Sequence, residues 1–153
     1  MSRHRIIAVI GLMCCVASAC SSPTSLLDEQ ALSRAEARWA ARAFDSYSYE
    51  TVTSCGECPA DVARQTRVEV RGGKVSAAIV VVNDSLLPTV ASFTTIDGLF
   101  ARIRGYQREA WLSEVRVDFD PQLGYPTNIR VFGKPGIMDA GYDVFISRLV
   151  PSR

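Results

Sequence analysis

The sequence predicts an α+β domain: an antiparallel sheet of about six strands with two helices packed on one of its faces. Three observations lead to this prediction. Two segments carry apolar residues at helical spacing, several others alternate apolar and polar residues, and tight-turn signals separate neighbouring strand-like segments. The expected order is helix, three strands, helix, three strands, and the short connections favour antiparallel pairing with both helices on one side.

The first helix is predicted over residues 25–45. Its apolar positions recur at helical spacing, as Leu32, Ala35, Trp39 and Ala43. Three arginines occupy another face at intervals of four residues, as Arg34, Arg38 and Arg42. Such a row could contact lipid headgroups if the domain were held near a membrane, but a solvated face is the simpler interpretation.

Two β sections are expected after this helix. In the first section, one strand is expected where Tyr47, Tyr49 and Thr51 alternate before the cysteine loop. A second, with Val68 and Val70, ends at the tight turn Gly72-Gly73, the third covers residues 74–82, and a loop covers residues 83–88. The second helix covers residues 96–108, with Thr94 or Thr95 as its cap. The second β section has strands at residues 115–119, 127–132 and 142–149, the first two joined by a turn at residues 120–124.

The amino terminus predicts export and lipid anchoring. Residues 1–5 are basic, residues 6–19 are apolar or small, and Ala17-Ser18-Ala19-Cys20 resembles the lipobox of bacterial lipoprotein precursors, although Leu is usual where Ala17 stands. In that class the Cys is acylated and becomes the first residue of the mature chain. We therefore expect a signal peptide over residues 1–19, a lipid-anchored tether over 20–25 and a single domain over 26–153. An ordinary cleaved secretory signal is the alternative.

The cysteines and the net charge agree with an exported protein. Of five cysteines, two lie in the apolar segment, Cys20 is the expected lipid site, and Cys55 and Cys58 remain. In an oxidising compartment these two are expected to pair, which would stabilise the fold by about 2 kcal/mol. Removing residues 1–19 takes two of the seventeen basic residues and leaves fifteen against sixteen acids. A mature charge near −1, without a basic stripe, argues against nucleic acid as a partner.

Several short motifs occur in a fixed order between residues 35 and 149. They are Trp39, Tyr47-Ser48-Tyr49, the Cys55/Cys58 loop, Val68-Glu69-Val70-Arg71-Gly72-Gly73-Lys74-Val75, Thr95-Ile96-Asp97-Gly98-Leu99-Phe100, Val117-Asp118-Phe119-Asp120 and Gly124-Tyr125-Pro126. In this order they resemble a family of small bacterial lipoproteins of unknown function, numbered six-one-seven-four among the domains of unknown function. The resemblance implies an envelope location and a fold of this kind, and it brings no activity.

The residues offer little for catalysis. The only histidine, His4, leaves with the signal, so neither a Ser-His nor a Cys-His pair can form in the mature chain. A zinc ion on Cys55 and Cys58 would need two further ligands. The Cys55-Gly56-Glu57-Cys58 motif could act as a thiol-disulfide redox centre, but it lacks the helix-start context that stabilises a reactive thiolate, so a structural disulfide is preferred.

Two acidic residues and one tyrosine complete the candidates. Asp118 and Asp120 share one face of a strand, but Leu123 and Ile129 stand where a calcium loop needs Gly and Glu, so turn-forming, solvated acids are the simpler interpretation. Tyr125 is a possible binding residue, although packing beside its hairpin is the simpler interpretation.

Together these features predict a membrane-anchored envelope lipoprotein without metal or cofactor. Its domain is expected to be non-catalytic, a binding or structural module that contacts an envelope protein or a small ligand through its uncovered sheet face or its loops. The alternative is a thiol-disulfide redox protein using Cys55 and Cys58. The lipid on Cys20 would hold it to a membrane, and Ser21 after it favours the periplasmic face of the outer membrane in bacteria with two membranes.

Overall fold

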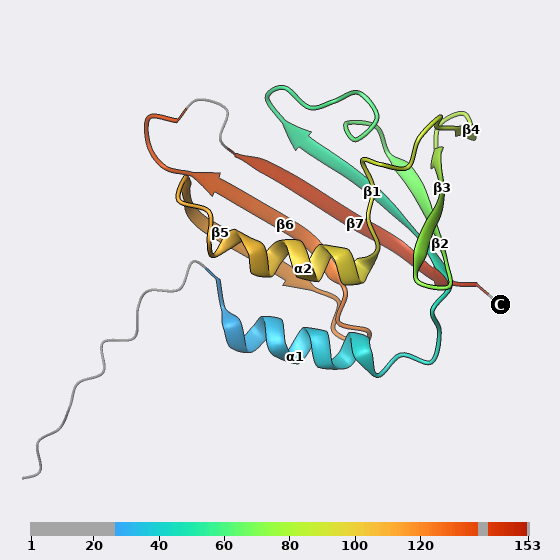
Figure 1. Ribbon diagram of the computed structural model, residues 1–153, viewed down its shortest axis with the longest axis horizontal. Coiled ribbons are helices and arrows are strands. Elements are labelled where there is room, and N and C mark those ends of the chain that lie inside the picture. Colours follow the sequence, from blue (N-terminus) through green and yellow to red (C-terminus); the bar gives the residue numbers. More distant parts are fainter. Residues whose placement is uncertain (1–26, 138–140, 153) are drawn as a thin grey trace, which may run out of the picture.

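The computed structural model describes residues 27–137 and 141–152 (Figure 1). Its helices and strands are α1 (Glu29–Ala40), β1 (Tyr47–Cys55), β2 (Thr66–Arg71), β3 (Lys74–Val80), β4 (Ser85–Leu86), α2 (Ile96–Tyr106), β5 (Leu112–Phe119), β6 (Pro126–Gly133) and β7 (Tyr142–Pro151). The expected signal peptide, the tether and Cys20 lie outside the described residues.

The strands form one antiparallel sheet in the order β4-β3-β2-β1-β7-β6-β5. The α+β class and the order of helices and strands are confirmed, but the sheet has seven strands and not six. The additional strand is β4, in a segment predicted as loop. It is two residues long, and it pairs with Ile79 and Val80 after a turn in which Asp84 has a φ of 51°. Two residues are too few to show the alternation by which a strand is recognised.

The first helix is shorter than the residue pattern predicted. Asp28 caps it by accepting hydrogen bonds from the backbone N–H groups of Gln30 and Ala31, and it ends at Ala40. Beyond Ala40 the Arg42 guanidinium donates to the carbonyl oxygen of Trp39 and pairs with Asp97 at the start of α2. The proposed row of three arginines is therefore broken, because Arg42 is directed toward the other helix.

The second helix is held to the sheet through its first residue. Thr95 caps α2 by accepting from the N–H of Gly98, as one of the two expected caps. The buried N–H of Ile96 donates to the hydroxyl of Tyr47 on β1 at 2.9 Å. A strand side chain thus satisfies one of the free N–H groups that every helix start leaves.

Both helices cover the same face of the sheet, and they run antiparallel to each other (Figure 1). Arg104 near the end of α2 pairs with Glu29 and Glu36 of α1, while Arg42 after α1 pairs with Asp97 at the start of α2. A single apolar core fills the space between helices and sheet, and its largest fully buried side chains include Trp39, Tyr47, Tyr49, Leu32, Ile96 and Ile103. In the described part of the chain, no helix combines the length and apolarity needed to cross a membrane.

Candidate functional site

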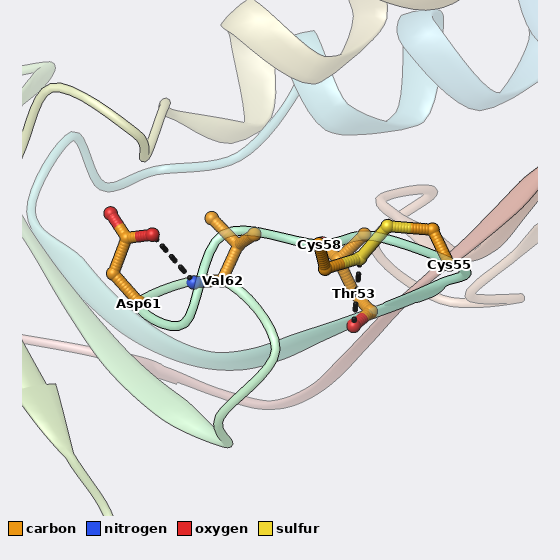
Figure 2. Close-up of a disulfide and its surroundings, with 5 residues drawn as sticks. All are labelled: Thr53, Cys55, Cys58, Asp61 and Val62. Carbon is orange, nitrogen blue, oxygen red and sulfur yellow. Dashed lines mark hydrogen bonds between the residues drawn. A yellow bond between two sulfur atoms is a disulfide. The ribbon is translucent and has the colours of Figure 1, made fainter.

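A disulfide-bonded loop follows β1 at one end of the sheet. Pairing of β1 with β2 stops at Thr51, whereas pairing with β7 continues to Cys55. Cys55 and Cys58 are joined by a disulfide with their Cα atoms 5.4 Å apart (Figure 2). The loop then folds back on its own strand, because the Val62 carbonyl accepts a 2.8 Å hydrogen bond from the N–H of Thr53. The disulfide therefore fixes a loop that lies along the end of β1.

The surroundings of Cys58 do not favour a thiolate. Its sulfur lies 3.7 Å from the carbonyl oxygen of Thr53 (Figure 2). A disulfide sulfur has no proton to donate, so this is only a contact in the oxidised protein. After reduction a Cys58 thiol could donate there, which stabilises the neutral form rather than the nucleophilic thiolate. No helix starts within residues 55–65, so the helix dipole that lowers the pKa of redox cysteines is also missing there.

Asp61 connects this loop to a second loop, the segment that precedes α2. One of its carboxylate oxygens accepts from the N–H of Val62, and the other accepts from the hydroxyl of Ser92. The hydrogen bond from Ser92 is the main cause that lowers the pKa of Asp61. The disulfide loop and residues 88–95 are therefore held together and form one wall of a depression in the surface.

That depression is a small cleft between the two loops, β1, β7 and α2. Thr51, Thr53 and Val144 line it from the sheet, Ser92 from the second loop and Arg102 from α2. Its cavity volume is about 30 Å³, room for one or two water molecules. We call it the Thr-Arg cleft.

In the Thr-Arg cleft the two threonines are half-buried and Arg102 is exposed, and the polar groups of these three residues have no partner among the described residues. Thr51 and Thr53 are two residues apart on a strand, so their side chains point to the same face, the one that also carries Tyr49. Neither hydroxyl has a hydrogen-bond partner among the described residues, and Arg102 forms no ion pair with them. The two hydroxyls and the guanidinium are therefore free to bind something else.

Tyr49 closes the inner end of the cleft. Its hydroxyl donates to the carbonyl oxygen of Thr94, and burial raises the pKa of its phenol far above the ordinary value. Tyr49 is therefore neutral and already hydrogen-bonded, and it serves as a wall. The chemistry of the cleft is that of one cation and of neutral hydroxyls, which suits the binding of a polar ligand.

Of the candidate site residues predicted from the sequence, some lie beside this cleft and others lie elsewhere. Cys55 and Cys58 adjoin it through Thr53 and Val62. Tyr125 does not: its half-buried ring packs against Trp39, with centroids 6.5 Å apart, and burial raises its pKa. Cys20 is outside the described residues.

Asp118 and Asp120 do not form a common site. Asp118 forms an ion pair with Arg130 at 2.9 Å on the uncovered face of the sheet. Asp120 instead accepts from the N–H groups of Gln122 and Leu123 and so builds the turn. No group of three or more potential metal-binding residues occurs among the residues that the structure describes.

The uncovered face of the sheet is mainly charged. Two phenylalanines are exposed on it, Phe132 to 38% and Phe145 to 43%. The cross-strand pair Arg130 and Asp143 lies between them, and the Arg116 guanidinium sits 5.2 Å from the centre of the Phe132 ring. The two rings therefore do not form a continuous apolar patch of the kind that marks many interfaces.

Sequence reasoning did not single out Thr51, Thr53, Ser92 and Arg102, which line the Thr-Arg cleft together with Tyr49 and Thr94. Threonines at alternating positions look like ordinary strand residues, and an arginine on an amphipathic helix looks like a solvated one. Only the fold, which brings two loops and a helix around the end of β1, puts them together.

The comparisons with known proteins identify a family whose function is unknown. A protein-family model described as "Family of unknown function (DUF6174)" matches residues 31–151. No curated protein and no solved structure matches the chain.

Proposed function

The chain belongs to the family of unknown function DUF6174, whose model spans residues 31–151, and for it we propose the role of a lipid-anchored binding module of the bacterial cell envelope. The domain would be exported, acylated on Cys20 and non-catalytic. Support for the anchor comes from the basic start, the apolar segment and the Ala17-Ser18-Ala19-Cys20 motif.

The binding role rests on one observation, the Thr-Arg cleft. It combines an arginine without an ion pair and two hydroxyls without hydrogen bonds in one small depression. The half-buried threonine hydroxyls lose part of their hydration, and hydrogen bonds to a ligand would compensate for that loss. The cleft thus supports the expectation that the ligand binds at the loops. The charged, uncovered face of the sheet offers less support for the other expectation, that the ligand binds there.

An anchor on Cys20 would keep the cleft close to a membrane. Leu27, where the described structure begins, is seven positions after Cys20. A fully extended chain advances at most about 3.3–3.6 Å per residue, so this tether reaches about 25 Å. The domain would therefore stay within about one domain diameter of the bilayer surface and meet envelope ligands there.

The redox alternative has less support. Reactive Cys-X-X-Cys motifs depend on a thiolate stabilised by a helix start or a nearby cation. The Cys58 sulfur contacts the carbonyl oxygen of Thr53, and Glu57 adds a negative charge in the same loop. We therefore favour a structural disulfide that shapes one wall of the cleft.

Intact mass of the full chain, expressed in a bacterial host and purified from membranes, tests the anchor. We expect a chain that begins at Cys20, carries acyl groups and has Cys55 and Cys58 protected from alkylation until reduction. The Cys20→Ala variant should lose the acyl mass, while Cys15→Ser, in the apolar segment, should keep it. A wild-type mass without acyl groups would refute the anchor, and immediate alkylation of both loop cysteines would revive the redox alternative.

A separate experiment tests the binding role of the cleft. Amide chemical shifts of the purified protein are followed while small solutes of different chemistry, neutral and charged, are added. Shifts concentrated at Thr51, Thr53 and Ser92 would support the role. If every solute perturbs these amides no more than exposed residues on the far face of the sheet, the cleft is not a binding site.

A further inference from the structure

We propose that the Thr-Arg cleft binds a small oxyanion, a carboxylate or phosphate group at the end of an envelope ligand. Arg102 would neutralise its charge, and the hydroxyls of Thr51 and Thr53 would donate hydrogen bonds to it. This inference rests on the proposed binding role of the same cleft and adds the charge and the size of the ligand.

The polar lining of the cleft favours an anion. It contains one guanidinium, which can only donate hydrogen bonds, and hydroxyls, which can donate. No acidic side chain lines the cleft. The carboxylate of Asp61, which contacts the lining residue Ser92, already accepts hydrogen bonds from the Ser92 hydroxyl and the N–H of Val62. Likewise the Thr94 carbonyl oxygen already accepts from Tyr49, so a cationic ligand would find few free acceptors.

Arg102 differs from the arginines beside other hollows of the described surface. Each of those already holds a carboxylate: Arg42 pairs with Asp97, Arg67 with Asp84, Arg71 with Glu69 and Arg104 with Glu36. Arg102 lines a cleft without such a partner. Guanidinium groups bind carboxylates and phosphates through parallel N–H donors, so a ligand oxyanion would take the place that a protein carboxylate occupies elsewhere.

The dimensions of the cleft suit one such group. The Cα atoms of two residues that are two positions apart on a strand are about 7 Å from each other. Hydroxyls at this spacing can each donate a bond of about 2.7 Å to different oxygens of one anion placed between them. A cavity of about 30 Å³ has room for one or two water-sized groups, so one or two oxygens of the anion would enter it and the remainder of the ligand would lie outside, toward solvent.

The experiment uses the mature chain in solution and four probes: inorganic phosphate, acetate, sodium chloride at matched ionic strength, and glycerol as a neutral solute. Amide and arginine side-chain shifts are recorded during each titration. We expect phosphate, acetate or both to shift the amides around Thr51, Thr53 and Ser92 and the Arg102 side-chain signal, with millimolar dissociation constants. Chloride and glycerol should produce no saturable change.

Three variants test the assigned residues. Arg102→Gln should weaken anion binding at least tenfold, and the isosteric pair Thr51→Val, Thr53→Val should weaken it severalfold. Arg108→Gln is the matched control, because Arg108 is an exposed arginine just beyond α2 that forms no ion pair with the described residues and does not line the cleft. The affinity of the Arg108→Gln variant for phosphate and acetate should remain within twofold of the wild-type affinity. Thermal unfolding of each variant confirms that the fold is retained.

The outcomes separate this inference from the proposed function. If neither anion perturbs the cleft more than chloride, or if Arg102→Gln binds as well as wild type, the oxyanion assignment is wrong. Saturable shifts with glycerol alone would refute the oxyanion assignment but leave the binding role of the cleft. If none of the four probes produces saturable shifts, both the oxyanion assignment and the binding role are refuted. Vesicles containing phosphatidylglycerol then identify the source: binding that depends on Arg102 indicates a lipid phosphate, and binding confined to the soluble anions indicates a soluble ligand.

Discussion

Replacing Gly124 by alanine should destabilise the domain strongly, because this glycine lies where the β5–β6 turn meets α1. Its φ is +81°, and an added Cβ would lie 2.3 Å from the carbonyl oxygen of Ala35 and 2.9 Å from the Cβ of Arg38. The left-handed conformation costs a residue with a side chain about 1–2 kcal/mol. Displacing a packed backbone adds about 1–3 kcal/mol, so we expect a total loss of about 2–5 kcal/mol.

Gly73 provides a matched control. Its φ is +73°, and an added Cβ would meet nothing within 4 Å. Gly73→Ala should therefore cost only the conformational term of about 1–2 kcal/mol. The difference between the two variants isolates the close approach of α1 to the turn.

Urea unfolding and thermal unfolding, both followed by tryptophan fluorescence and by circular dichroism, measure the free energy of unfolding and the melting temperature of both variants against wild type. For a domain of this size each kcal/mol lowers the melting temperature by about 4 °C, so Gly124→Ala should melt about 4–12 °C below Gly73→Ala. Equal losses in the two variants would mean that α1 does not pack against the turn as closely as described, and the reasoning would fail.

Three further predictions concern the tyrosines and the disulfide. Tyr47→Phe removes the acceptor of the buried Ile96 N–H and should cost about 1–3 kcal/mol in urea unfolding, whereas Tyr125→Phe, whose hydroxyl has no hydrogen-bond partner among the described residues, should change stability by less than about 0.5 kcal/mol. Burial raises the pKa of Tyr49 and of Tyr106 above the ordinary value of 10.0. The folded protein then keeps protons that the unfolded chain releases, so stability should be unchanged by these groups below that pH and fall above it. A phenolate absorbance at pH 10 that is smaller in Tyr49→Phe or Tyr106→Phe than in wild type, with all three proteins still folded, would contradict this. The Cys55→Ser, Cys58→Ser variant should lose about 2 kcal/mol and still fold, since the Thr53–Val62 hydrogen bond also holds the loop; loss of cooperative unfolding would show that the disulfide supports more than its loop.

Periodicity predicted most of the fold because the core is regular. Alternation along β1, β2 and β5 and helical spacing in α1 and α2 reflect which side chains face a single core. The boundaries were less well predicted. The first helix was extended to residue 45, because Ala43 and Phe44 fit its apolar pattern, but the ion pair of Arg42 with Asp97 and the ring contact of Phe44 with Trp39 occur after the helix has ended. Such contacts between distant residues leave no periodic trace.

The irregularity of β7 was equally invisible in the sequence. Arg148 adopts a φ of +49° within the strand, opposite a register shift between Ser48 and Glu50. Its guanidinium pairs at 3.3 Å with Glu50, whose side chain is only 9% exposed. Arginine has no preference for this conformation, so a strained backbone is retained where the surrounding sheet and a nearly buried carboxylate both hold the residue.

The strand that carries the candidate site shows why a fold can be predicted where its site is not. Tyr47, Tyr49, Thr51 and Thr53 all point to the covered face of the sheet. The two tyrosines are fully buried and reach the start of α2 through their hydroxyls, whereas the two threonines are half-buried beneath the loops. The change from aromatic to hydroxyl side chains therefore occurs where helix cover gives way to the cleft. Alternation in the sequence predicts which face of the sheet a side chain occupies, but it does not predict what covers that face. The candidate oxyanion site is therefore recognised only from the position of Arg102 relative to these threonines in the folded structure.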